Sequence, residues 1–181
     1  MDTVRKILLI IPSSIIFFLI VPVISLFVGR SLDQFLGINS IEWGLAGPIV
    51  SIALFLVGSY YVVESIRILL VRGKGIPLGD VFTEDQSTEL ITTGIYAQTR
   101  NPMLFGYLLV LVALGILMRS ISIAFIIPSI FIILWTIWLK IREEPALEVR
   151  FGKAYLEYKK ETPYLIPRPK RKSGKKIVKG A

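Results

Sequence analysis

Apolar residues are concentrated in four long segments, which are separated by shorter stretches rich in charged residues, glycine and proline. The segments cover 7–28, 43–71, 103–118 and 121–139. About twenty apolar residues are enough for a helix to cross the hydrocarbon core of a bilayer. The third segment is shorter than that, so we expect it to cross with little tilt or to thin the bilayer locally. The pattern predicts an all-α integral membrane protein with about four transmembrane helices.

A different periodicity follows the last apolar segment. Apolar and aromatic side chains recur there at intervals of four, four and three residues, at Leu147, Phe151, Tyr155 and Tyr158. This spacing places them on one face of an amphipathic helix. Such a helix packs against the transmembrane bundle or lies on the membrane surface, and the prolines after residue 162 end regular structure.

Lysine and arginine are distributed unevenly among the connections. Two precede the first apolar segment, three lie between 72 and 102, and thirteen follow residue 139, whereas the connections on the other side hold only Arg30 and Arg119. Basic residues favour the cytoplasmic side of a membrane. The chain is therefore predicted to be a multi-pass membrane protein whose two termini, 72–101 connection and C-terminal amphipathic helix are cytoplasmic.

Composition narrows the chemistry that the chain can perform. It is 54% hydrophobic and 19% charged, whereas a soluble domain carries about 25% charged residues. The sequence contains no cysteine and no histidine, which excludes disulfides, a thiol nucleophile, a histidine base and the usual zinc sites. Any catalysis must use the other polar side chains or a bound cofactor.

Most of the net charge of +8 lies at the C-terminal end. Residues 168–181 hold seven basic residues and no acidic ones. A basic segment beside a membrane is attracted to anionic lipid headgroups. Nucleic-acid binding is disfavoured because no recognised fold or interleaved aromatic residue accompanies the charges. We expect a single membrane domain at 1–167, followed by a disordered basic tail at 168–181.

Two charged stretches lie where apolar segments meet water, at 94–106 and 142–158. Arg100 in the first is a fixed cation that can grip a carboxylate through two parallel hydrogen bonds. Glu143 and Glu144 in the second offer acceptors for an ammonium group or for ribose hydroxyls. The same stretches supply aromatic side chains that can enclose a flat ring, namely Tyr96, Phe105, Phe151, Tyr155 and Tyr158. S-adenosylmethionine has these needs, and so do NADPH, a nucleotide and a lipid headgroup.

Each part also has a purely structural interpretation. Asn101 and Pro102 form an ordinary helix start, with asparagine as the cap and proline in the first turn. Arg100 can anchor that helix at the headgroups, and the two glutamates can pair with Lys140 or Arg142.

A further pair of charges lies within the second apolar segment. Glu64 and Arg67 are three residues apart, so they share a helix face and can pair. Charges inside a membrane segment are candidates for function. Near a helix end they can instead extend to the interface.

Taken together, the stretches resemble the isoprenylcysteine carboxyl methyltransferase and phospholipid methyltransferase superfamily. In that superfamily a Gly-x-Tyr-x-x-x-Arg-(His or Asn)-Pro-x-x-x-Gly stretch opens a transmembrane hairpin, and residues 94–106 match it. A Glu-Glu-x-x-Leu-x-x-x-Phe-Gly-x-x-Tyr-x-x-Tyr stretch and a Pro-x-x-(Ile or Leu)-Pro ending follow, which 143–158 and 163–167 match. Residues 73–78 also resemble the Gly-x-Gly-Thr-Pro segment of bacterial and archaeal members. The resemblance extends over about 45–168.

The resemblance implies a site for S-adenosylmethionine at the cytoplasmic face, open towards the lipid, within a catalytic core at about 72–167. The residues that it implies for the cofactor are Tyr96, Arg100, Asn101, Pro102, Gly106, Glu143 and Glu144. The methyl acceptor is then a lipophilic small molecule or a lipidated one, with a prenylcysteine-type carboxylate or a phospholipid-type amine. Prenylcysteine methyltransferases often have histidine where this chain has Asn101, and asparagine cannot accept a proton in its place.

The acceptor decides which residues catalyse. A carboxylate is already ionised near neutral pH and needs no base, and Arg142 is a candidate to orient it. An amine or hydroxyl must lose a proton, for which Glu143, Glu144 and Tyr96 are the candidates.

Two other classes remain open at the level of sequence. Intramembrane NADPH-dependent sterol reductases resemble the superfamily in their C-terminal half, although they are usually larger. A non-catalytic four-span membrane protein is the third class. Binding of S-adenosylmethionine, of NADPH or of neither separates the three.

Overall fold

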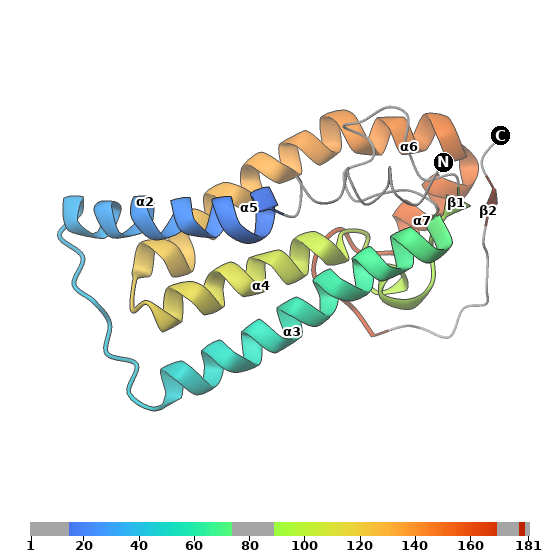
Figure 1. The fold of residues 1–181 in the computed structure, drawn as a ribbon. Helices are drawn as coiled ribbons and strands as arrows, with labels where there is room; N and C mark the ends of the chain where they lie inside the picture. Colours follow the sequence, from blue (N-terminus) through green and yellow to red (C-terminus); the bar gives the residue numbers. More distant parts are fainter. Residues whose placement is uncertain (1–14, 74–88, 170–177, 180–181) are drawn as a thin grey trace.

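The computed structural model describes residues 15–73, 89–169 and 178–179. Long helices lie side by side, and the shorter C-terminal elements gather at one end of them (Figure 1). The α-helices are α2 (Val21–Phe35), α3 (Ala46–Ile68), α4 (Pro102–Leu117), α5 (Ile127–Trp138), α6 (Glu144–Phe151) and α7 (Lys153–Glu161). The short 3₁₀ helix η3 (Gly94–Ala97) leads into α4. A two-residue antiparallel pairing of β1 (Glu89–Leu90) with β2 (Val178–Lys179) is added to this helical fold.

Four turns of π-helix interrupt or extend these helices, at η1 (Ile16–Ile20), η2 (Leu69–Gly73), η4 (Ser122–Ile126) and η5 (Leu139–Glu143). Three of them come two residues before a proline, namely Pro22, Pro128 and Pro145. Proline has no N–H to donate, and a wider turn is one way for a helix to accommodate it. Helical structure is therefore continuous from Ser122 to Phe151, through η4, α5, η5 and α6.

The turn before Pro22 leaves one backbone carbonyl without a donor from its own helix. Val21 N–H donates to the Ile16 carbonyl, which is the π-helical pattern. The donor that this pattern would assign to the Phe17 carbonyl is residue 22, a proline. The Tyr107 hydroxyl in α4 donates to the Phe17 carbonyl instead, at 2.8 Å. An unsatisfied carbonyl inside a bilayer costs several kcal/mol, so this bond ties the first helix to α4.

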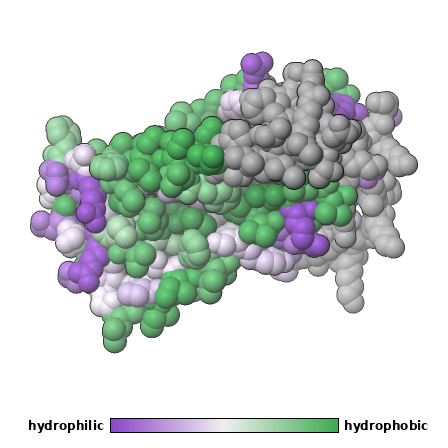
Figure 2. Space-filling view, viewed as in Figure 1, coloured by the Kyte–Doolittle hydropathy of each residue, from purple (hydrophilic) through white to green (hydrophobic). Residues whose placement is uncertain are grey.

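Three described helices are long and apolar enough to cross a membrane, at Ile16–Phe35, Ala46–Val71 and Ser122–Phe151. Apolar side chains cover most of the coloured sides of the bundle, and hydrophilic ones gather at its left end (Figure 2). The protein is therefore a multi-pass membrane protein. The apolar helix α4 has 16 residues, which corresponds to about 24 Å and is less than the hydrocarbon thickness of about 30 Å. The fourth crossing thus stays a prediction.

Helices α3 and α4 approach each other closely at two glycines. A Cβ atom on Gly106 would lie 2.5 Å from the Gly58 carbonyl oxygen, and one on Gly58 would lie 2.6 Å from the Gly106 carbonyl oxygen. The buried Ser51 hydroxyl donates to the Ala113 carbonyl at 2.7 Å along the same contact. Small residues let membrane helices approach in this way, and a hydroxyl adds an interhelical hydrogen bond.

Side-chain contacts also fasten the end of the bundle opposite the C-terminal elements. The Asp33 carboxylate accepts hydrogen bonds from the Ser120 hydroxyl and from the Ser122 N–H, the latter at 3.0 Å. The exposed Arg119 guanidinium pairs with Glu42 at 2.7 Å.

The predicted pair of charges near the C-terminal end of α3 is confirmed. Arg67 donates to both Glu64 carboxylate oxygens, at 2.6 and 2.7 Å.

The expected amphipathic helix is divided between two helices. Helix α6 ends at Phe151, and α7 begins at Lys153. Gly152 between them has a φ of 53°, which glycine readily adopts. Beyond the break, Tyr155 and Tyr158 still join Phe151 and Leu90 in one buried cluster. The four apolar positions therefore share a core, but they do not lie on a single continuous helix. Most of the predicted basic tail, and residues 74–78 of the glycine-rich segment, lie outside the described residues.

Candidate functional site

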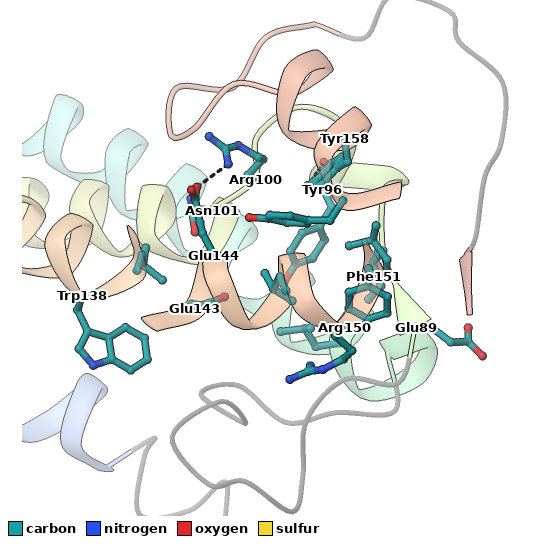
Figure 3. A pocket seen from close by; sticks show the side chains of 16 residues that line it. Glu89, Tyr96, Arg100, Asn101, Trp138, Glu143, Glu144, Arg150, Phe151 and Tyr158 are labelled. Carbon is teal, nitrogen blue, oxygen red and sulfur yellow. Dashed lines mark hydrogen bonds and ion pairs between the residues drawn. The ribbon is translucent and has the colours of Figure 1, made fainter. Parts of the chain in front are cut away.

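The two charged stretches meet at the end of the bundle where α6 and α7 lie. Arg100 Nη1 is 2.5 Å from Glu144 Oε1, and only 12% and 10% of the two side chains are exposed. Arg100 comes from the segment before α4, whereas Glu144 is the first residue of α6 (Figure 3). The expectation that the two stretches share one face of the molecule is confirmed.

Glu144 is also held from a third element. Lys159 Nζ in α7 is 2.6 Å from Glu144 Oε2 and 2.8 Å from Glu148 Oε1. The hydrogen bond to Glu144 and then that to Glu148 raise the pKa of Lys159 above its ordinary value. Both carboxylate oxygens of Glu144 thus have basic partners, and neither partner is Lys140 or Arg142. The sequence did not predict that Lys159 pairs with Glu144. Lys159 is one of two adjacent lysines in α7, and nothing in the surrounding sequence distinguishes it from the other.

Two cavities lie around this ion pair. The first, which we call the polar cavity, has a volume of about 140 Å³ and is lined partly by charged residues, including Glu89, Arg100, Glu143, Glu144 and Arg150. The second, which we call the apolar cavity, has a volume of about 180 Å³ and lies among the membrane helices. Its lining is mainly aromatic and aliphatic, and includes Phe17, Tyr107, Phe131 and Trp135. Because the two cavities have similar volumes, neither is a small side pocket of the other.

The two cavities have part of their lining in common. Six residues border both, namely Leu69, Tyr96, Arg100, Asn101, Leu139 and Glu143. We call these six residues the shared wall. A molecule in the polar cavity and a molecule in the apolar cavity would therefore approach each other here, beside a guanidinium, a carboxylate, an amide and a phenol.

Tyrosines enclose the polar cavity as neutral groups. The Tyr158 hydroxyl donates to the Tyr96 carbonyl at 2.7 Å. Desolvation raises the pKa of Tyr96 and of Tyr158 well above the ordinary value, and it raises the pKa of Tyr155 to about 12. All three phenols therefore stay protonated near neutral pH, which argues against Tyr96 as a proton acceptor.

The predicted residues around the start of α4 have different surroundings. Asn101 precedes the helix as expected and borders both cavities, but its side chain does not cap α4. Its Nδ2 donates instead to the Tyr164 carbonyl at 2.9 Å. Pro102 borders the apolar cavity. Gly106 borders neither cavity and contacts α3.

The two residues predicted to catalyse also differ in their placement. Glu143 is partly exposed and belongs to the shared wall. Arg142 is exposed and borders neither cavity. Consecutive helical residues point about 100° apart, and here Glu143 borders both cavities whereas Arg142 borders neither.

The family model of phospholipid methyltransferases matches residues 47–154, which is more than half of the chain. The chain therefore belongs to the phospholipid methyltransferase family, in agreement with the resemblance of its motifs. Membership and the apolar spans define its class as a membrane methyltransferase. No match is found among curated proteins or among solved structures.

Proposed function

We propose that the protein transfers a methyl group from S-adenosylmethionine to a lipophilic acceptor at the cytoplasmic face of a membrane. The observation that carries this proposal is the shared wall, whose six residues border both a polar cavity and an apolar one. A charged nucleoside cofactor suits the first, and the hydrocarbon part of a lipid suits the second. Family membership favours this activity over an NADPH-dependent reductase or a non-catalytic membrane protein.

The residues of the polar cavity fit a zwitterionic cofactor. Arg100 Nε is buried and has no hydrogen-bond partner among the described residues, although Glu144 accepts a bond from its Nη1. A buried guanidinium N–H without an acceptor is costly. The carboxylate of the methionine part of the cofactor would supply that acceptor. We assign Glu144 to holding Arg100, since both of its own oxygens are already engaged.

S-adenosylmethionine supplies an electrophilic methyl group on a sulfonium. The protein must align the acceptor with that methyl group and exclude water. We place the reacting atoms at the shared wall, where Asn101 and Tyr96 supply polar surface. Glu143 is the residue there that can accept a proton from an amine acceptor. We assign no catalytic role to Arg142, because it is exposed and borders neither cavity.

A phospholipid-type amine is the acceptor that this arrangement favours. An amine is protonated near neutral pH and must lose a proton before it can attack. Glu143 at the shared wall meets that need, whereas it would repel the carboxylate of a prenylcysteine. The family match points the same way.

Ligand binding tests the proposal directly. We expect S-adenosylmethionine and S-adenosylhomocysteine to raise the melting temperature of the detergent-solubilised protein, and NADPH to leave it unchanged. A ligand at 100 times its Kd stabilises the folded state by about 2.7 kcal/mol. A folded preparation that responds to neither adenosyl compound would contradict the proposal.

The proposed orientation has a separate test. We expect single cysteines in Ser40→Cys and Lys160→Cys to react with an impermeant thiol reagent from opposite sides of sealed vesicles. Both positions are exposed, and the chain has no cysteine of its own to interfere. The Lys160→Cys protein should be labelled only from the cytoplasmic side. Labelling of both proteins from one side would overturn the orientation.

A further inference from the structure

The segment after α7 is bound along the four residues that precede α4. Residues 163–168, which we call the strap, contain the Pro-x-x-Ile-Pro motif and lie beyond the family match, which ends at residue 154. Arg100 N–H donates to the Pro163 carbonyl at 2.9 Å, and Arg168 N–H donates to the Gln98 carbonyl at 3.0 Å. Asn101 Nδ2 donates to the Tyr164 carbonyl at 2.9 Å.

Thr99 is the buried centre of this contact. It has no exposed surface, and its hydroxyl lies 2.8 Å from the Leu165 carbonyl and 3.2 Å from the Tyr164 carbonyl. Thr99 borders neither cavity. Thr99 therefore binds the strap to the short segment between η3 and the cavity residues Arg100 and Asn101. Its own side chain does not reach the site.

The aromatic ring of Tyr164 in the strap contacts the Arg100 guanidinium. The Arg100 guanidinium carbon lies 5.5 Å from the centre of the Tyr164 ring, which is within the range of a cation–π contact. Tyr164 borders neither cavity. Arg100 is thus held by Glu144 through its Nη1, by Pro163 through its backbone and by Tyr164 through its side-chain plane.

These contacts matter because Arg100 and Asn101 precede the helix. Within the first turn of α4, backbone N–H groups have no acceptor in the helix itself. The Asn101 carbonyl accepts one bond from the helix, from Phe105 N–H at 3.0 Å, and the strap accepts the bonds that the Asn101 side-chain amide and the Arg100 N–H donate. An arginine that must present one free N–H edge to a carboxylate needs a fixed guanidinium plane.

We propose that the strap is a positioning element for the cofactor site, and that Thr99 and Tyr164 are positioning residues which fix Arg100 and Asn101 at the shared wall. This inference rests on the proposed function, since the quantity that it governs is affinity for the adenosyl cofactor. It assigns a role to the Pro-x-x-Ile-Pro motif and to two residues that touch neither cavity.

The first test uses Thr99→Val and Thr99→Ser. Valine keeps the shape of threonine but loses the hydroxyl, which leaves strap carbonyls unpaired. Serine keeps the hydroxyl. Titration calorimetry with S-adenosylhomocysteine, well below the melting temperature, should show a Kd about tenfold higher for Thr99→Val. The Kd of Thr99→Ser should stay close to that of the parent protein.

The second test uses Tyr164→Leu and Tyr164→Phe. Leucine removes the aromatic face and leaves the backbone bonds of the strap possible, whereas phenylalanine keeps the face. We expect a Kd for S-adenosylhomocysteine about fivefold higher with leucine, and recovery of the parent value with phenylalanine. Ile166→Ala is the matched control, because Ile166 belongs to the strap but is 73% exposed.

The outcomes separate the inference from the function on which it rests. If the parent protein binds no S-adenosylhomocysteine, the proposed function fails. If the parent binds and both Thr99→Val and Tyr164→Leu bind equally tightly while folded, the strap is only structural and the inference is wrong. A lower melting temperature with unchanged affinity gives that same negative answer. Weakened affinity with recovery by serine and phenylalanine supports the inference.

Discussion

Replacing Arg100 by methionine should weaken S-adenosylhomocysteine binding by at least about a hundredfold. Such a loss corresponds to roughly 3 kcal/mol, which is the cost of removing a charged hydrogen-bond donor from a buried ligand site. The substitution also leaves Glu144, a carboxylate whose side chain is only 10% exposed, with Lys159 as its remaining basic partner. Breaking a buried ion pair from one side is destabilising, so the melting temperature should fall as well. Titration calorimetry and thermal unfolding measure the two effects.

Arg67→Met is the matched control for this substitution. Arg67 also pairs with a glutamate, but its side chain is 64% exposed and it borders neither cavity. Exposed ion pairs contribute little, so its affinity for S-adenosylhomocysteine and its melting temperature should stay close to the parent values. An Arg100→Met protein that binds as tightly as Arg67→Met would show that Arg100 is an anchor and that the cofactor lies elsewhere.

Gly106→Ala should destabilise the protein strongly without changing the affinity of the protein that remains folded. The added Cβ would lie 2.5 Å from the Gly58 carbonyl oxygen and 2.8 Å from the Tyr61 Cβ. Helices α3 and α4 would have to separate, and overpacking of this kind costs about 1–3 kcal/mol. Thermal unfolding in detergent should show the loss, and ligand titration on the folded fraction should show an unchanged Kd.

Val57→Leu provides the comparison for that substitution, since it adds a methylene group at an exposed position of α3 beside Gly58. Its melting temperature should match that of the parent. If Gly106→Ala keeps the parent stability but loses affinity, then Gly106 contacts the cofactor as the resemblance to the superfamily implies.

Much of the architecture could be predicted from hydrophobic pattern alone. The apolar segments became helices because spacing and length are local properties, and the distribution of basic residues placed the two charged stretches on one face. Arg100 and Glu144 lie in contact, which agrees with that placement, although this particular pair was not predicted. The break at Gly152 was missed, because the apolar spacing continues across it while the backbone does not.

The partners of each site residue could not be predicted in the same way. Asn101 had the right type and position for a helix cap, yet its amide bonds to a carbonyl 63 residues later. Gly106 fitted a cofactor motif, yet the close approach of α3 explains why only glycine is accommodated there. Such contacts depend on which segments of the chain pack against each other, and the local sequence pattern does not indicate this. Lys159 is the clearest case, because nothing local distinguishes it from the exposed Lys160 beside it.

The continuous helix from Ser122 to Phe151 determines where this chain can accept inserted or deleted residues. A helix of 30 residues is about 45 Å long, so about a third of it extends beyond a hydrocarbon core of about 30 Å. Glu143 and Glu144 lie in the C-terminal third of this helix. Inserting one residue between Pro128 and Leu139 would turn them by about 100° and raise them by about 1.5 Å relative to Arg100. The exposed connection at 36–45 has no such geometric link to the site, so gain or loss of residues should be accepted there and rejected within the long helix.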